Sequence, residues 1–160
     1  MLLKGKNIVL GVTGGIAAYK AVELVSRLRK AGCNVDVIMT EAATKFVTPL
    51  TFREISGNPV TVSMWDEPKQ WNVAHVSLAT KADLFVIAPA TANIIGKIAN
   101  GIADDMLSTT VMATKAPVIL APAMNANMYQ NPIVIQNLAK LAGLCYHIIK
   151  PASGWLACGV

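Results

Sequence analysis

The fold of this chain is decided by residues 7–16, which read NIVLGVTGGI. Asn7–Val12 forms a continuous apolar run, which is typical of a parallel strand buried on both faces. Thr13-Gly14-Gly15 breaks that run, and Ile16–Lys30 then repeats apolar side chains at helical spacing until Gly32 ends the helix. A buried strand, a glycine turn and an amphipathic helix together predict the first βα unit of an α/β fold.

The same alternation continues to the end of the chain. Further strands are predicted at Asn34–Met39, Asp83–Ala88, Pro117–Ala121 and Cys145–Ile149, with a weaker one at Val60–Val62. Further helices are predicted at Ala92–Ala99 behind a Thr91 cap, from an Asp104 or Asp105 cap through Ala113, and from Asn131-Pro132 to Lys140 with Gly143 closing it. Residues 1–160 are therefore predicted to form a single three-layer, doubly wound parallel sheet domain, Rossmann-like or flavodoxin-like.

Composition narrows the function classes. Of 160 residues, 54% are apolar and 14% are charged, against about 25% charged in a typical domain. This excludes disorder, and no apolar run is long enough to span a membrane. The low charge predicts burial of part of the surface in an oligomer. The net charge of +5 comes from scattered basic residues without a nucleic-acid-binding motif. Three cysteines without metal spacing indicate a cytoplasmic protein without a metal site.

In open α/β sheets, ligands bind beyond the carboxyl ends of the strands. There the sequence places Thr13-Gly14-Gly15-Ile16, then Thr40, then the segment from Pro89 and Ala90 through Thr91 to Asn93. The glycines and the free N–H groups of the following helix suit a phosphate. The spacing is not GxGxxG, and Thr40 replaces the acidic residue that would hold a ribose, so a single phosphate, as on FMN, is favoured over NAD. The alternative is a turn that needs glycine for its geometry alone.

The segment Pro122–Tyr129, PAMNANMY, follows another predicted strand as a loop. Asn125 could hydrogen-bond a carboxylate or an amide, and Met124 and Met128 could line a flat ring. The alternative is an asparagine-rich turn that leads to the Asn131 cap.

Two further residues are candidates by their chemistry. His75 precedes the Asp83 strand, so it is expected at the amino edge of the sheet, opposite the ligand site. It could reach a ligand site only if the chain makes a long excursion, or if the site belongs to a neighbouring subunit. Its alternative is a structural histidine. Cys158 stands beside a glycine in a terminal loop, which suits a proton donor on a flap or an ordinary thiol.

Taken together, these motifs resemble one family, the homo-oligomeric flavin-containing cysteine decarboxylases. The resemblance covers the whole chain and rests most specifically on Pro122–Met128. It is carried further by residues 11–17 (GVTGGIA), the His75 segment, residues 88–93 (APATAN), residues 97–104 (KIANGIAD) and residues 156–159 (LACG).

The resemblance implies FMN-dependent decarboxylation of 4′-phospho-N-pantothenoyl-L-cysteine to 4′-phosphopantetheine in coenzyme A biosynthesis. It implies that His75 assists substrate oxidation, that Asn125 holds the substrate carboxylate, and that Cys158 protonates the enethiolate. Met128 and Ala157 complete the substrate site, and the three segments at the strand ends hold FMN. It also implies a trimer, or a dodecamer of such trimers, with the site between subunits.

The sequence departs from the family pattern in two places. Val160 follows the Cys158-Gly159 pair where the family usually has an acidic residue, and Ala79 and Thr80 stand where a basic residue often follows the histidine. A longer bifunctional chain, of which this would be the N-terminal part, is compatible with the pattern. The alternatives are a peptidyl-cysteine decarboxylase, a flavin prenyltransferase, a non-enzymatic regulatory subunit and an NAD-type module.

Overall fold

The computed structural model describes residues 2–66 and 73–151. Its strands are β1 (Asn7–Val12), β2 (Asn34–Met39), β3 (Val60–Thr61), β4 (Leu84–Ala90), β5 (Val118–Pro122) and β6 (His147–Ile148). Its helices are α1 (Ala18–Lys30), the 3-10 turn η1 (Ala42–Lys45), α2 (Pro49–Ser56), α3 (Ala74–Lys81), α4 (Ala92–Ala99), α5 (Met106–Ala113), α6 (Ala126–Tyr129) and α7 (Pro132–Gly143).

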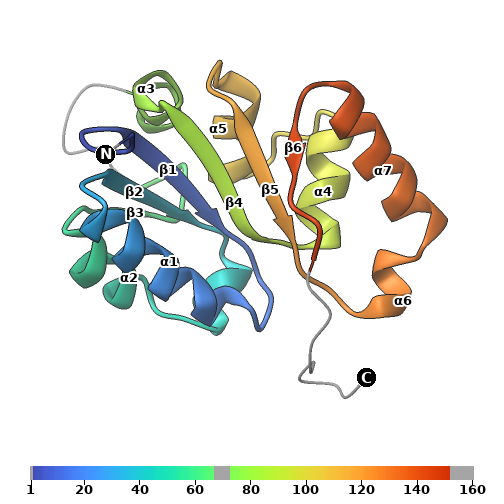
Figure 1. The fold of residues 1–160 in the computed structure, drawn as a ribbon, viewed down its shortest axis with the longest axis horizontal. Coiled ribbons are helices and arrows are strands. Elements are labelled where there is room, and N and C mark those ends of the chain that lie inside the picture. The colour runs from blue at the N-terminus through green and yellow to red at the C-terminus, as the bar shows by residue number, and fades with distance from the viewer. Residues whose placement is uncertain (1, 67–72, 152–160) are drawn as a thin grey trace.

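The strands form one parallel sheet in the order β3-β2-β1-β4-β5-β6. The chain winds outward from β1 in one direction and from β4 in the other, so the strand order reverses between these two neighbours (Figure 1). The predicted doubly wound α/β fold is thus confirmed, and the reversal marks the place where ligands bind in such sheets.

Helices cover both faces of the sheet. Ile8, Leu10 and Val12 of β1 pack with α1 and α2 on one face, whereas Val9 packs with α4 and α5 on the other. Gly11 lies on the second face, where a Cβ atom would come within 2.5 Å of a methyl group of Leu107. A glycine at this position lets α5 pack directly on the sheet.

The helix caps agree with the prediction. The hydroxyl of Thr91 accepts a hydrogen bond from Ile94 N (3.3 Å), Asp105 accepts one from Ser108 N (2.8 Å), and Asn131 accepts one from Ile133 N (2.9 Å). Side-chain acceptors at these positions satisfy N–H groups that the helix leaves unpaired.

The structure corrects several of these predictions: α1 begins at Ala18, β4 spans Leu84–Ala90, β5 spans Val118–Pro122, and α2 and α3 were not predicted. Helix α7 ends at Gly143, the predicted closing residue, and includes Gly143 as its last residue. The last strand begins only at His147, because Cys145 adopts a φ of 67° in the turn that ends α7. The segment Pro122–Tyr129 is not all loop, since it contains α6.

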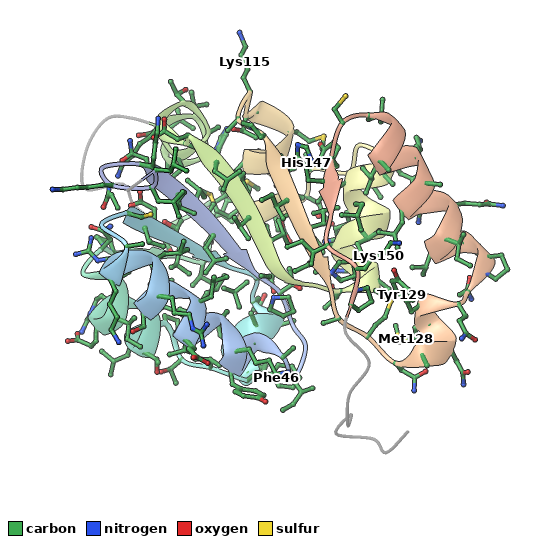
Figure 2. The ribbon with its side chains drawn as sticks, in the orientation of Figure 1. Phe46, Lys115, Met128, Tyr129, His147 and Lys150 are labelled. Carbon is green, nitrogen blue, oxygen red and sulfur yellow. The ribbon has the colours of Figure 1, made fainter. Side chains whose placement is uncertain are left out.

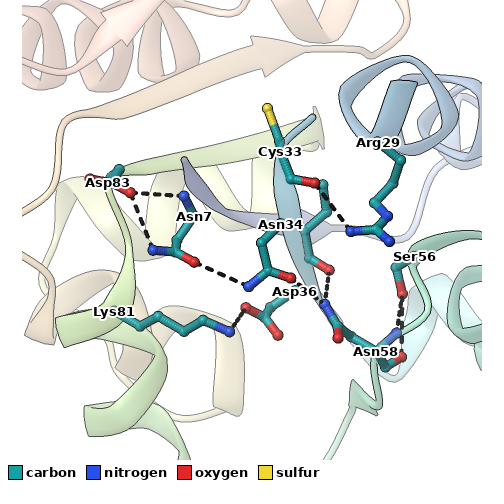
Figure 3. A network of polar contacts seen from close by, with 10 residues as sticks. Asn7, Arg29, Cys33, Asn34, Asp36, Ser56, Asn58, Lys81 and Asp83 are labelled. Atoms are coloured by element: carbon teal, nitrogen blue, oxygen red, sulfur yellow. Dashed lines mark hydrogen bonds and ion pairs between the residues drawn. The ribbon is translucent and has the colours of Figure 1, made fainter. Parts of the chain in front are cut away.

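A polar network joins the amino ends of the strands, opposite the predicted site (Figure 3). Asp83 accepts hydrogen bonds from Asn7 N (2.8 Å) and Asn7 Nδ2 (3.3 Å). Asn34 donates to Asn7, and Lys81 forms an ion pair of 2.7 Å with Asp36. The hydrogen bond from the Asn7 backbone, with help from Lys6, lowers the pKa of Asp83. The network links neighbouring strands at the amino edge of the sheet, and the predicted site lies at the carboxyl edge.

Within residues 2–66 and 73–151, no helix has the length and apolar character needed to cross a membrane.

Candidate functional site

An open cleft of about 1490 Å³ lies along the carboxyl edge of the sheet. The connections after β1, β2, β3, β4 and β5 all contribute to its walls, as does the first turn of α1. Figure 2 shows Phe46 and Met128 at the carboxyl edge, on either side, and Lys115 at the opposite end of the molecule. Most of the predicted site residues in the described chain line this cleft: Thr13, Gly14, Gly15, Ile16, Thr40, Pro89, Thr91, Asn93, Asn125 and Met128.

The glycine turn has a steric reason for only one of its two glycines. A Cβ atom on Gly14 would lie 2.5 Å from the Ala42 Cβ and 3.1 Å from the Ala42 carbonyl carbon. A Cβ atom on Gly15 would meet its nearest neighbour, a Thr91 methyl group, at an ordinary 3.7 Å. Gly14 therefore allows the close approach of η1, and Gly15 leaves room in the cleft in front of α1.

Thr13 ties the two central turns together. It is 1% exposed, and its hydroxyl donates to Pro89 O (2.6 Å) and accepts from Thr91 N (3.2 Å). The hydroxyl of Thr40 accepts from Ala43 N (3.1 Å) in the same way. Both hydroxyls thus hold the shape of the cleft wall, which the sequence alone did not indicate.

The segment after β4 presents the start of α4 to the cleft. Pro89, Thr91 and Asn93 line it, and Asn93 is exposed in the first turn of the helix. Ala90 was predicted to contact the cofactor, but it is fully buried and does not line the cleft. Its carbonyl oxygen accepts a hydrogen bond from Ala123 N (3.1 Å).

Asn125 is both a helix cap and a cleft residue. Its side-chain oxygen accepts a hydrogen bond from Asn127 N (2.8 Å) at the start of α6. Asn125, Met124 and Met128 all line the cleft. The two interpretations of this segment are therefore compatible, since the cap fixes the position at which Asn125 faces the ligand space.

The cleft wall contains an ion cluster that was not predicted from the sequence. Lys97 of α4 contacts Asp104 at 2.8 Å and Asp105 at 3.5 Å, and its side chain is 19% exposed. The hydrogen bond between the two groups raises the pKa of Lys97 and lowers the pKa of Asp104. The acidic pair was visible in the sequence as a helix cap, but its distance from Lys97 depends on how α4 packs on α5.

Three predicted site residues remain, His75, Ala157 and Cys158, and the structure describes only the first of them. His75 is half-buried in the first turn of α3 and does not line the cleft, as the sequence order predicts. Cys158 and Ala157 lie outside the described residues, so their predicted roles stay predictions.

Comparison with known proteins places the chain in a family. The model of the Flavoprotein family matches residues 2–160. The coenzyme A biosynthesis bifunctional protein CoaBC of Bacillus subtilis (strain 168) is 51% identical over 158 residues, and that of Escherichia coli (strain K12) is 50% identical over 159 residues. Each alignment covers 99% of this chain but only 39% of the relative. The chain thus spans about two fifths of these relatives.

Solved structures show the same fold. The FMN-dependent cysteine decarboxylase SpaF superimposes with a TM-score of 0.89 at 35% identity, covering 95% of this chain and 87% of SpaF. A mutant PPC decarboxylase complexed with pantothenoylaminoethenethiol superimposes with a TM-score of 0.85 at 31% identity, covering 98% of this chain and 87% of that one. The family model matches nearly the whole chain, and the doubly wound sheet and the glycine turn agree with it. The chain therefore belongs to the Flavoprotein family.

Proposed function

We propose that this chain catalyses the FMN-dependent decarboxylation of 4′-phospho-N-pantothenoyl-L-cysteine to 4′-phosphopantetheine in coenzyme A biosynthesis, and that it does so in the cytoplasm. One observation carries the proposal. A single cleft joins a glycine turn suited to a phosphate with an asparagine suited to a carboxylate, although the two are more than 100 residues apart. The CoaBC relatives and the PPC decarboxylase structure support this substrate.

The cleft fits FMN together with a substrate. Its volume of about 1490 Å³ exceeds the roughly 300–1,000 Å³ of a typical single-ligand pocket. The N–H groups of Ala18 and Lys20 in α1 donate to Gly15 O and Ala17 O, so the N–H groups that remain for a phosphate among the described residues are those of Ile16 and Ala17, between the glycine turn and α1. Met64, Met106 and Met124 contribute polarisable side chains to the same lining, which suits a flat aromatic ring.

Bound FMN would supply a two-electron acceptor that later returns the electrons. The chain's own contribution begins with Asn125, whose amide would hold the substrate carboxylate by hydrogen bonds. A cation would stabilise that carboxylate in the ground state and oppose the loss of CO2. Lys97, which lines the cleft from α4, is already paired with Asp104 and Asp105. This pairing leaves Lys97 neutralised by protein carboxylates instead of by the reacting carboxylate.

The proposed roles of His75 and Cys158 require other parts of the assembly. In a trimer, His75 of one subunit would assist substrate oxidation in the cleft of its neighbour. Four such trimers would form the dodecamer. Two exposed apolar residues beside it support this arrangement, since Val73 is 56% exposed and Val76 is 50% exposed. Cys158 would donate the proton that converts the enethiolate to the product thiol.

The proposal is tested with purified protein. We expect a visible flavin spectrum, a released chromophore with the mass of FMN at about one per chain, and CO2 release from 4′-phospho-N-pantothenoyl-L-cysteine. A colourless protein that takes up no added FMN would contradict the proposal.

A second substrate class is a peptide with a C-terminal cysteine, and the similarity to SpaF, an FMN-dependent cysteine decarboxylase, is compatible with it. The same CO2 assay with such a peptide separates the two. If only the peptide is turned over, the proposed substrate is wrong, whereas the proposed flavin-dependent decarboxylation is kept.

A further inference from the structure

Helix α3, which carries His75 in its first turn, is only weakly anchored by apolar packing. Of its eight residues only Ala79 is buried, and the half-buried Leu78 packs against the core beside it. Val73, which precedes the helix, provides no side-chain cap. Most of the stability of a short helix comes from its packing against the rest of the protein. The orientation of α3 must therefore be set by other contacts as well.

Two polar contacts hold the carboxyl-terminal end of α3. The hydroxyl of Thr114, the residue that caps the end of α5, donates a 2.9 Å hydrogen bond to Ala79 O. Lys81, the last residue of α3, donates to Asp36 Oδ2 at 2.7 Å. Figure 3 shows this ion pair at the amino edge of the sheet. Both contacts lie at one end of the helix, and His75 lies at the other.

The ion pair joins two elements that are not neighbours in the sheet. Helix α3 leads into β4, whereas Asp36 belongs to β2, and β1 lies between these two strands. Asp36 is level with Val9 of β1, which is level with Phe85 of β4. A contact that reaches across β1 controls how α3 is turned relative to the sheet, which a contact with β4 itself would not.

The burial of Asp36 makes this contact obligatory. Asp36 is 9% exposed, and the other residues of β2 from Val35 to Met39 are apolar and buried. Among the described residues, Lys81 is its one ion-pair partner. A carboxylate at this depth is stable only when it is paired, whereas an apolar residue would need no partner. The stability of β2 therefore does not account for the pair, but the anchoring of α3 does.

We propose that Lys81 is a positioning residue that, through its ion pair with Asp36, holds α3 at the angle from which His75 acts. Lys81 comes six residues after His75, which corresponds to about 9 Å along a helix axis. A tilt of about 6° at the Lys81 end would therefore move His75 by about 1 Å, a displacement that can lower a catalytic rate by about 100-fold. This inference rests on the proposed function, in which His75 assists substrate oxidation.

The kinetic test uses the FMN-loaded protein and 4′-phospho-N-pantothenoyl-L-cysteine. The initial loss of flavin absorbance in the absence of oxygen gives the rate at which the substrate passes two electrons to FMN. We expect Lys81→Met to lower this rate by about tenfold, with KM and FMN content within about twofold of the wild type. Lys81→Arg should keep most of the rate, because its guanidinium group pairs with Asp36. Lys6→Met is the matched control, since it breaks an ion pair at the same edge but outside α3, between Lys6 and Asp83 (3.5 Å).

A second measurement reports on His75 without any turnover. The chain contains two histidines, His75 and His147, so NMR of protein with labelled histidine gives two imidazole signals, which His75→Asn assigns. Lys81→Met should move the His75 signal and leave the His147 signal in place, and Lys6→Met should move neither. If Lys81→Met does not fold because Asp36 is left unpaired, the double variant Asp36→Asn/Lys81→Met removes both charges and takes its place.

The outcomes separate this inference from the proposed function. An unmoved His75 signal in Lys81→Met would overturn the inference, whether or not the enzyme is active. A loss of rate in Lys6→Met or in Lys81→Arg as large as that in Lys81→Met would also overturn it. A wild type that passes no electrons from the substrate to FMN would instead overturn the proposed function.

Discussion

The hydroxyl of Thr13 donates a 2.6 Å hydrogen bond to the carbonyl oxygen of Pro89, which lies 76 residues later in the chain. This bond joins the turn after β1 to the turn after β4, at the point where the strand order reverses. The same hydroxyl accepts from Thr91 N, so one buried side chain fixes two walls of the cleft. Removing the hydroxyl takes this partner from the carbonyl of the buried Pro89 and from the N–H of the half-buried Thr91.

Thr13→Val should therefore destabilise the protein by about 1–3 kcal/mol, the cost of leaving buried polar groups without partners. Thr13→Ser keeps the hydroxyl and serves as the matched control, with a smaller loss from the missing methyl group. Urea denaturation measures both. Equal stability of the two variants would mean that the hydrogen bonds contribute little to holding the turns.

The two glycines of the turn should respond differently to alanine. Gly14→Ala places a methyl group 2.5 Å from Ala42 Cβ and against backbone atoms of η1, so we expect a loss of about 1–3 kcal/mol. Gly15→Ala meets its nearest atom at 3.7 Å and should leave the stability of the ligand-free protein close to that of the wild type. Thermal unfolding of the two ligand-free variants compares them. A greater loss of stability in Gly15→Ala than in Gly14→Ala would mean that Gly15, and not Gly14, is the glycine that packing requires.

Asn125→Asp should separate binding from turnover. Aspartate is as good a helix cap as asparagine, so α6 and the melting temperature should be preserved. FMN content should also be preserved, but CO2 release should fall below detection because a second carboxylate repels that of the substrate. Flavin absorbance and CO2 release are measured on the same preparation. Normal turnover would remove Asn125 from the proposed role.

Cys158→Ser should interrupt the proposed reaction after decarboxylation. CO2 should be released in a single turnover, and the enethiol should accumulate in place of 4′-phosphopantetheine because the proton donor is missing. Mass spectrometry of the quenched reaction detects both species. If CO2 release itself stops, Cys158 acts earlier in the reaction than proposed.

Asp83 should make stability depend on pH in the acidic range. Its pKa is lowered from the usual 3.8, first by the hydrogen bond from Asn7 N and then by Lys6, so the folded state favours the charged carboxylate. The resulting stability is fully present above 3.8 and is lost as the pH falls through the lower pKa of the folded state. The difference in unfolding free energy between the wild type and Asp83→Asn should therefore shrink below that pH. A difference that is constant from pH 2 to pH 7 would contradict this linkage.

Local patterns sufficed for most of the secondary structure. The strands Asn7–Val12 and Asn34–Met39 and the helix Ala92–Ala99 have the predicted bounds, because continuous apolar runs and a threonine cap are signals within a few residues. Helices α2 and α3 were missed because they bury only two side chains and one side chain respectively, and α6 was missed because its four residues bury none. The predicted start of the last strand was wrong because a left-handed residue in the preceding turn gives no apolar signal.

The sequence by itself determined the fold class and the edge of the sheet at which the cleft lies, because the alternation of strands and helices follows from periodicity and turn chemistry. The order of the strands in the sheet came from the structure. Only the tertiary structure decided the roles of particular side chains in that cleft. It assigned the Thr13 hydroxyl to Pro89 and Thr91, and it paired Lys97 with Asp104 and Asp105. Hydrogen bonds and ion pairs depend on distances of a few ångströms between elements far apart in the chain, and those distances are set by packing.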